Sequence, residues 1–514
     1  MATLRYARRF SLLFASLALG GAALVAACVG DEPAGPGAGG GADSGSDAVT
    51  DGAGGDGSTA DSCASATTCG ADTCVDLKTD PAHCGTCDVS CKNSAGTPFA
   101  CVQSVCGNKV AQLSAGRRAS CVLLLDGSVW CWGQQVDGET GQVSALLTPV
   151  PQKVAGLPTI VAVHSASSNS CAIDTNGDVW CWGDNRAGQL AQTIGTEPEC
   201  GGNCNHTPQK VTLPEKTAQI TGSNETMCVR TVPGNVYCWG RNEANILGQG
   251  TDPMATHATP LKIPVFAGDV TDLDLTYANN GFPGLHALAC AVRADKTVWC
   301  WGSNVRGELG HVPDGGTSAD ITCAGTSPYA CNATPQPIPG ASGNLANVVK
   351  VKTRNMGACA LLTDQTVWCW GNNNEGELGQ GVDDGSIHTL PLEALDFPVA
   401  TLTSADVSSF ALTIDGGVYV WGANPNGVLG LGNFNADLSG DIARNGSLGG
   451  IVQLSTYADH GLALKADGTM VTWGNNTTGV LGHAPNSGTD VVCPATGNGA
   501  CNATPAAFGT APWQ

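Results

Sequence analysis

Cysteine is the residue type whose number and spacing point most directly to chemistry in this chain. The sequence has 514 residues and 25 Cys. Two copies of a recurring pattern carry Phe410 with Val420 and Leu462 with Thr472 at positions where five other copies carry two Cys. Both sites are therefore gained or lost together, as expected for a bonded pair. The pattern predicts five disulfides between Cys that are always ten residues apart: Cys121 with Cys131, Cys171 with Cys181, Cys228 with Cys238, Cys290 with Cys300, and Cys359 with Cys369.

Local geometry supports this pairing. In most of the seven copies an Asp-Gly or Asn-Gly dipeptide lies between the two sites. A three-residue hairpin loop with Gly in the left-handed conformation would place the two Cys opposite each other on one face of the hairpin. Each bridge would close a loop of about 11 residues and contribute about 2.8 kcal/mol on the chain-entropy estimate. Three more pairs close insertions that end in Cys-Asn-x-Thr-Pro, and we expect disulfides there too: Cys200 with Cys204, Cys323 with Cys331, and Cys493 with Cys501.

A further Cys lies at the end of an export signal. Arg5, Arg8 and Arg9 precede an apolar run over residues 10–27, and small residues lead into Cys28. These features predict a secretory signal over residues 1–27. The small residues resemble the lipobox of bacterial lipoproteins, which implies that Cys28 is acylated and that the protein is anchored in the bacterial cell envelope, facing the periplasm or the exterior. The alternative is an uncleaved membrane helix, but about 18 apolar residues rich in Ala and Gly are marginal for a span.

The next two segments have unusual compositions. Residues 28–62 consist mainly of Gly, Ala, Asp and Ser, which predicts a flexible tether. Residues 63–107 hold eight Cys and very few large apolar side chains, so we expect a small module held together by disulfides. Within it, Cys84-Gly-Thr-Cys87 leaves a redox or zinc motif as an alternative. If Cys28 carries lipid, 24 Cys remain and complete pairing is possible.

Composition limits the class of fold and partner. The 70 Gly and 27 Pro favour short strands and turns over helices. The formal net charge is −21, and removal of a signal with three Arg and no acidic residue lowers it to −24. Tight nucleic-acid binding depends on Lys and Arg, and this chain has no basic stripe or tail. We therefore expect no nucleic-acid partner, and contact with a membrane only through the N-terminal lipid.

A repeat organises residues 108–514. A Trp-Gly pair recurs seven times, and six residues after each Trp begins a turn resembling Gly-x-Leu-Gly. Each repeat contains about four short strands, including a Thr-Pro-x-x-Val segment. Seven repeats of about four strands each predict an all-β fold, a seven-bladed propeller of four-stranded antiparallel blades. The repeated Trp are interpreted as residues that pack between sheets: Trp132, Trp182, Trp239, Trp301, Trp370, Trp421 and Trp473.

The repeat Asp-Gly-x-Val-Trp-Cys-Trp-Gly-x-Asn-x-x-Gly-x-Leu-Gly resembles that of the regulator of chromosome condensation family, which implies a seven-bladed β-propeller. The His usual before the hairpin is mostly missing, and His460 is its closest match. The eukaryotic namesake is a guanine nucleotide exchange factor that docks on chromatin, whereas secreted bacterial relatives include a β-lactamase inhibitor that binds its target with one face. An exported, acidic chain is more similar to the secreted bacterial relatives than to the chromatin-binding factor. We expect a monomeric, non-catalytic module that binds an unknown protein or extracellular ligand. A glycan-cleaving propeller enzyme is the alternative, and an exchange-type regulator is suggested by the family name alone.

Other chemistry has weaker support in the sequence. His311 and His483 occupy matching places after Leu-Gly and could suggest a metal pair, but equivalent loops lie far apart on a ring. Asp383-Asp384 is interpreted as a solvated turn. The Asn-x-Thr segments match glycosylation acceptors, although their shared Thr-Pro context favours turns: Asn205, Asn332 and Asn502. We predict no catalytic, metal or cofactor-binding residues.

The two ends of the repeat region suggest how the ring closes. The first repeat begins at residues 110–113 with no Thr-Pro strand ahead of it, while residues 504–508 supply such a strand with no hairpin after it. An open ring would expose unpaired strand edges. We therefore expect residues 504–508 to pair with the blade that contains residues 110–133.

Overall fold

A computed structural model describes residues 110–509 and 512, except for 143–145, 196–202, 251–255, 279–285, 314–319, 324–328, 435–439, 495–496 and 498. It also describes the backbone of four short strands before residue 107: β1 (Thr67–Thr68), β2 (Cys74–Val75), β3 (Cys101–Val102) and β4 (Val105–Cys106). The expected signal, Cys28 and the tether lie outside the described residues. The chain divides into two compact units, residues 1–60 and 61–514, and all described residues belong to the second.

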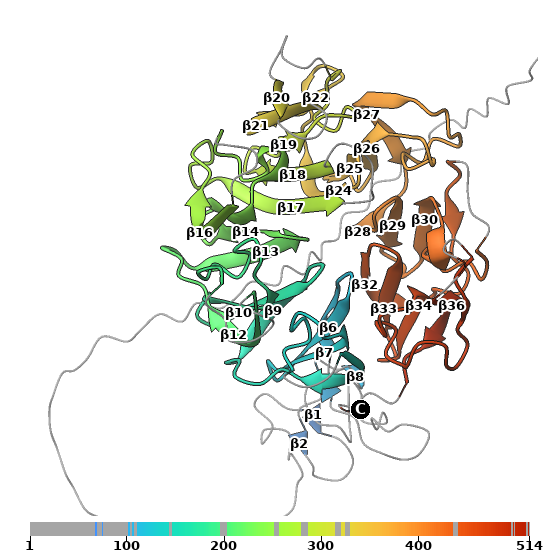
Figure 1. Ribbon diagram of the computed structural model, residues 1–514. Coiled ribbons are helices and arrows are strands. Elements are labelled where there is room, and N and C mark those ends of the chain that lie inside the picture. Colours follow the sequence, from blue (N-terminus) through green and yellow to red (C-terminus); the bar gives the residue numbers. More distant parts are fainter. Residues whose placement is uncertain are drawn as a thin grey trace, which may run out of the picture. The chain divides into compact units, whose positions relative to one another are not determined.

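Seven antiparallel sheets form the blades of a propeller (Figure 1). The first four, from inner to outer strand, are blade 1, β5 (Val110–Ala115), β6 (Ala119–Leu124), β7 (Val129–Gln134) and β8 (Leu147–Lys153); blade 2, β9 (Ile160–Ser165), β10 (Asn169–Asp174), β11 (Val179–Asp184) and β12 (Cys204–Lys210); blade 3, β13 (Thr217–Ser223), β14 (Thr226–Thr231), β15 (Val236–Arg241) and β16 (Thr256–Lys262); and blade 4, β17 (Val270–Ala278), β18 (His286–Arg293), β19 (Val298–Ser303), β21 (Tyr329–Pro337) and β20 (Ile321–Cys323).

The other three are blade 5, β24 (Val348–Arg354), β25 (Gly357–Leu362), β26 (Val367–Asn372) and β27 (Ile387–Leu395); blade 6, β28 (Val399–Ser404), β29 (Ser408–Thr413), β30 (Val418–Gly422) and β31 (Ala443–Arg444); and blade 7, β32 (Ile451–Tyr457), β33 (His460–Lys465), β34 (Met470–Asn475), β36 (Ala500–Ala507) and β35 (Val491–Val492). Two short strands, β22 (Pro339–Gly340) and β23 (Gly343–Asn344), pair with each other, and the 3₁₀ turns are η2 (Glu243–Asn245) and η3 (Pro425–Gly427). The described residues contain no helix long and apolar enough to span a membrane.

Antiparallel order gives the ring two distinct faces. We name as the insert face the side with the turns between first and second strands and the loops between third and fourth strands of each blade. The opposite side, the hairpin face, carries the Asp-Gly hairpins and the connections between blades. In blade 1, Arg118 lies in the turn between β5 and β6, and Asp137 lies in the loop between β7 and β8. The guanidinium of Arg118 donates to Asp137 at 3.1 Å, so this turn and this loop lie on the same side of the ring.

The hairpins place the paired Cys opposite one another. Cys121 faces Cys131 across β6 and β7, and the same register occurs in the next four blades. In blades 6 and 7 the equivalent positions face each other in the same way, as Phe410 and Val420 or Leu462 and Thr472. The structure confirms all five ten-apart disulfides, each within one hairpin: Cys121 with Cys131, Cys171 with Cys181, Cys228 with Cys238, Cys290 with Cys300, and Cys359 with Cys369.

Two of the three expected insertion disulfides also lie within the described residues. Cys323 is bonded to Cys331 in blade 4, where β20 pairs with β21. Cys493 is bonded to Cys501 in blade 7, beside the pairing of β35 with β36. The third expected pair includes Cys200, which lies outside the described residues, so its bond to Cys204 stays a prediction.

Each repeated Trp lies buried between two blades. All seven have a relative exposure of 0%. The indole N–H of each donates to the backbone carbonyl of the residue seven positions after the Trp of the preceding blade, at 2.5 to 3.1 Å. For example, Trp182 of blade 2 donates to Glu139 of blade 1. The repeated Trp therefore bonds as well as packs, and it joins every blade to its neighbour.

The Gly after each Trp has a steric reason. Its φ lies between 89° and 121° in all seven blades, a region that favours Gly. A Cβ there would lie less than 3 Å from a backbone carbonyl oxygen near the start of the second strand, such as that of Arg118 beside Gly133. The Trp-Gly pair thus combines an interblade bond with close approach of the second and third strands.

The expected mode of ring closure is wrong. Residues 504–507 belong to β36, which pairs with β34 of its own blade and not with blade 1. The Thr-Pro strand is the outer strand of the repeat that precedes it, so every blade is continuous in sequence. Blades 7 and 1 meet through side chains instead: Phe508 packs on Trp132 with ring centroids 5.0 Å apart, and the Trp132 indole donates to the carbonyl of Val480 at 2.7 Å. An apolar cluster containing Leu462 and Val110 fills the same junction.

Candidate functional site

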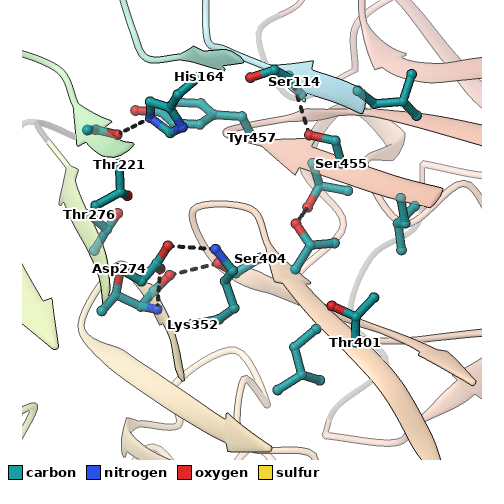
Figure 2. A pocket seen from close by; sticks show the side chains of 18 of the residues that line it. Ser114, His164, Thr221, Asp274, Thr276, Lys352, Thr401, Ser404, Ser455 and Tyr457 are labelled. Atoms are coloured by element: carbon teal, nitrogen blue, oxygen red, sulfur yellow. Dashed lines mark hydrogen bonds and ion pairs between the residues drawn. The ribbon is translucent and has the colours of Figure 1, made fainter. Parts of the chain in front are cut away.

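A central channel is lined by polar side chains from every blade. Its volume is about 470 Å³, and it is lined by the seven inner strands β5, β9, β13, β17, β24, β28 and β32 (Figure 2). Each inner strand pairs with the second strand of its own blade, and this pairing skips the second residue of the inner strand. Beyond that irregularity, alternate side chains point to the channel because side chains of a strand alternate between faces.

Most polar groups of the channel wall bond adjacent inner strands together. Gln112 of β5 donates to the carbonyl of Val163 in β9 and accepts from its N–H, both at 2.9 Å. Ser114 accepts from the N–H of Ser165 at 2.7 Å. Side-chain hydrogen bonds also join other adjacent inner strands, as where Gln453 of β32 donates to the carbonyl of Ala111 in β5. These groups therefore hold the blades in place.

Of the charged groups that line the channel, four belong to blades 4 and 5, and the fifth, Asp406, belongs to blade 6, where burial raises its pKa to about 6. Asp274 of β17 accepts from Lys352 of β24 at 2.6 Å (Figure 2). Burial lowers the pKa of Lys352, but the charge of Asp274 and its hydrogen bond outweigh this effect and raise the pKa overall. Lys350, two residues earlier, donates to Thr401 Oγ1 at 3.0 Å. Burial, reinforced by the neighbouring Lys352, lowers the pKa of Lys350.

Tyr457 crosses the channel. It extends from blade 7, and its hydroxyl lies 3.4 Å from the hydroxyl of Ser223 in blade 3. Burial raises the pKa of Tyr457 to about 12, so the phenol is protonated at neutral pH. His164 lies beside it and donates from Nε2 to the carbonyl of Gly222 at 2.9 Å. Burial lowers the pKa of His164, which favours the neutral ring.

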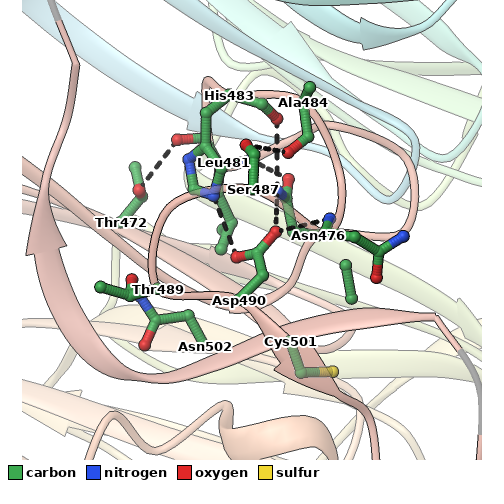
Figure 3. Close-up of polar contacts among 12 residues, drawn as sticks. Thr472, Asn476, Leu481, His483, Ala484, Ser487, Thr489, Asp490, Cys501 and Asn502 are labelled. Carbon is green, nitrogen blue, oxygen red and sulfur yellow. Dashed lines mark hydrogen bonds and ion pairs between the residues drawn. The ribbon is translucent and has the colours of Figure 1, made fainter.

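The insert face carries the largest insertions, and a matching His–Asp contact closes two of them. His311 Nε2 lies 2.8 Å from Asp320 in blade 4, and His483 Nε2 lies 2.9 Å from Asp490 in blade 7 (Figure 3). Both Asp side chains are fully buried. An Asn from the Trp-Gly-x-Asn segment, Asn476 in blade 7, donates to the second carboxylate oxygen at 2.8 Å. Each His therefore bonds to an Asp of its own loop.

Blades 1 and 2 share a cluster of charges on the insert face. Asp137 accepts hydrogen bonds from Arg118 and from Arg186 of the next blade. Glu139 lies beside them, only 1% exposed, and accepts from the N–H of Asp137 at 2.8 Å. Burial raises the pKa of Glu139 to about 7, despite these hydrogen bonds and the charge of Arg118. The carboxyl of Glu139 is thus half protonated near neutral pH.

The remaining sequence candidates have local structural contacts. Asn205, Asn332 and Asn502 are buried, and each accepts from the backbone N–H two residues later. They lie within the outer strands β12, β21 and β36 and not in turns, so the expectation of turns there is wrong. His460 is buried within 3.1 Å of the Ser120 hydroxyl, and burial lowers its pKa to about 4. Asp384 contacts His388 at 2.8 Å. Among the described residues, no group of three or more His, Cys, Asp or Glu could hold a metal ion.

Sequence reasoning missed the channel residues. Polar residues alternate along the inner strands, as in Asp272 with Asp274 and Lys350 with Lys352, and this period of two was the available signal. The alternation alone does not say which face of the strand meets a cavity. The ring arrangement supplies that information.

Comparisons with known proteins show what several of the repeats are similar to. The family model for the regulator of chromosome condensation (RCC1) repeat matches residues 110–139, 160–189, 358–377 and 451–479, and a second model of this repeat matches residues 176–229. The human E3 ubiquitin-protein ligase HERC2 is 26% identical over 69% of this chain, but the match spans only 7% of HERC2. The ultraviolet-B receptor UVR8 of Arabidopsis thaliana is 27% identical, over 73% of this chain and 79% of UVR8.

Solved structures agree on the fold. Prp20p from Saccharomyces cerevisiae has a TM-score of 0.59 at 19% identity, covering 76% of this chain and 87% of that chain. Human WBSCR16 has a TM-score of 0.57 at 17% identity, covering 71% of this chain and 88% of its own. Five segments of this chain are therefore similar to regulator of chromosome condensation repeats, and the chain folds as a seven-bladed β-propeller.

Proposed function

We propose that this protein is an exported, lipid-anchored propeller that binds a protein partner through its insert face without catalysing a reaction. The observation that carries the proposal is that two insertions on one face are each closed by a disulfide and a His–Asp contact. The loops of blades 4 and 7 both emerge between third and fourth strands, and each combines a disulfide with a buried His–Asp contact. Loops that are ordered before binding lose less conformational entropy when they bind.

These insertions also expose apolar side chains. Ile321 of β20 is 47% exposed, and Val491 and Val492 of β35 are 49% and 60% exposed. Exposed apolar groups with a polar rim are typical of protein interfaces. Prp20p, which shares the fold, is described with binding to Gsp1p and histones. That precedent supports protein binding as a use of the fold, and the acidity of this chain favours other partners.

Quantitative crosslinking on intact cells tests the proposal. The full-length protein serves as bait, beside an Ile321→Asp/Val492→Asp variant of the insert face. The control is Ile414→Asp on the hairpin face, where Ile414 is 67% exposed. We expect the insert-face variant, and not the control, to lose a specific crosslinked protein. Equal recovery with all three baits would exclude the insert face as the binding surface.

The anchor has a separate test. Mass spectrometry of the mature protein should find a lipid-modified N-terminus at Cys28, and Cys28→Ala should release the protein from membranes. A soluble wild-type protein that starts at another, unmodified residue would refute the anchor.

A further inference from the structure

We propose that the central channel is a binding site for a small organic carboxylate, held by the ammonium groups of Lys350 and Lys352. The site is distinct from the insert face, so either proposal can fail alone. The argument begins with the hydrogen-bonding capacity of the charged groups that line the channel.

The two acidic side chains of blade 4 are already satisfied by the protein. Asp272 accepts from the side chain of Gln219 at 2.9 Å and from the N–H of Val351 at 3.0 Å, one bond to each oxygen. Asp274 accepts from Lys352 through one oxygen and from the N–H and hydroxyl of Thr353 through the other. Each of the four oxygens therefore has a partner, and these bonds also tie blade 4 to blade 5.

The two Lys side chains of blade 5 are not satisfied in the same way. An ammonium has three N–H donors. Within the described residues Lys350 donates one bond, to Thr401, and Lys352 donates one, to Asp274. Both side chains line the cavity, and they share a face of β24 because they are two residues apart. The two Lys of blade 5 thus have spare N–H donors, and the one further acidic side chain among the residues that line the cavity is Asp406, whose pKa burial raises to about 6.

Electrostatics favour an anion at this point. Lys350 has no ion pair among the described residues, and its lowered pKa shows that nearby acidic groups do not compensate for the burial of its charge. A carboxylate beside Lys350 would supply the missing countercharge and two acceptor oxygens. Hydroxyl groups of Thr401 and Thr276 also line the cavity and would accommodate polar substituents of the ligand.

The size of the cavity fits a small molecule. Its volume of about 470 Å³ lies within the range of roughly 300–1,000 Å³ found for small-molecule sites. Tyr457, which crosses the channel to Ser223, limits the length of a ligand and presents an aromatic ring to it. These features favour a hydroxy acid or sugar acid over a polymer.

Calorimetric titration with matched probes tests the proposal. Sodium gluconate, lactate and acetate are the carboxylate probes, and glucose is the neutral counterpart that shares hydroxyl groups with gluconate. We expect saturable binding of at least one carboxylate and none of glucose at the same concentrations. Lys350→Met should weaken this binding at least tenfold, and Lys350→Arg should retain most of it. Lys262→Met, on the exposed outer strand of blade 3, is the matched control and should bind like wild type.

Circular dichroism and thermal melting verify that the variants fold. If Lys350→Met does not fold, one-dimensional NMR of wild type with labelled Lys keeps the test open, because a bound carboxylate must shift the side-chain resonances of Lys350. Absence of saturable binding by all three carboxylates would overturn the proposal. Equal binding of glucose and gluconate would overturn it too, as would unchanged affinity in a folded Lys350→Met protein.

Discussion

At the scale of single residues, the repeated Trp shows how one side chain can serve two purposes. Its ring fills the space between blades, and its N–H satisfies a buried carbonyl that has no strand partner. Removing only the N–H leaves that carbonyl unsatisfied, which typically costs about 1–3 kcal/mol. The two effects can be separated because each third strand of blades 1, 2, 4 and 5 carries a second, half-buried Trp two residues earlier.

Trp301→Phe should therefore lower the free energy of unfolding by about 1–3 kcal/mol, because the carbonyl of Ile246 loses its 2.6 Å bond. Trp299→Phe on the same strand is the control, since its N–H reaches only the nearby Thr297 hydroxyl at 3.1 Å. Urea denaturation measures both. Equal losses in the two variants would show that ring packing, and not the interblade bond, determines the cost.

Glu139 gives a second prediction at this scale. Its pKa is about 7 in the folded protein against 4.5 in the unfolded chain. Between pH 4.5 and about 7 the carboxyl of Glu139 is deprotonated in the unfolded chain but still protonated in the folded protein. The free energy of unfolding therefore falls as pH rises through this window and stays low above it. The shift corresponds to about 3 kcal/mol. Glu139→Gln should remove this decline and be more stable than wild type at pH 8.

Blade 2 contains a natural precedent for this substitution. Gln189 occupies the equivalent position and accepts from the N–H of Ala187 at 2.9 Å, as Glu139 does from Asp137. Unfolding of both proteins from pH 4 to 8 measures the difference. Parallel stability curves for wild type and Glu139→Gln would contradict the prediction.

At the scale of elements, the hairpin register is what the sequence could specify. A fixed spacing of ten residues and a Gly at the turn place Cys171 opposite Cys181, and the structure has this register. The outer strand was harder to assign. A Thr-Pro segment lies between two hairpins in the chain, so its sequence does not state which hairpin it joins. The structure pairs it with the preceding third strand, and the expected closure by residues 504–508 failed for this reason.

The disulfides give the prediction at this scale. Peptide mapping without reduction should recover each of the five ten-apart pairs within its own hairpin. Replacing Cys121 and Cys131 by the residues of blade 7, as Cys121→Leu/Cys131→Thr, should leave the fold intact and lower stability by at most about 3 kcal/mol. Free Cys, or bridges between different blades, would refute the assignment.

At the scale of the whole molecule, the junction between blades 7 and 1 has no covalent reinforcement among the described residues. It depends on contacts such as Phe508 on Trp132. Phe508→Ala should therefore destabilise the protein by about 3–5 kcal/mol, the usual cost of removing a buried Phe side chain. Thermal and urea unfolding measure this. The control is Phe397→Ala, which removes a partly buried aromatic side chain from contact with Tyr419. Phe397 lies where the chain runs directly from blade 5 to blade 6. A smaller effect at Phe508 than at Phe397 would show that other contacts close the ring.

The bond from each Trp to the preceding blade also has a consequence for chain connectivity. All seven junctions use the same donor and acceptor positions, whether or not the two blades are consecutive in the chain. The covalent order of blades is then not what specifies their order in space. A circular permutant that joins the end of β36 to the start of β5 by a linker as long as residues 154–159, with new termini at Gly446–Gly449, should fold to the same propeller. At this opening a Cβ on either Gly would meet no neighbouring atom within 4 Å. The position of the chain ends is thus a property that could change during evolution while the ring is retained.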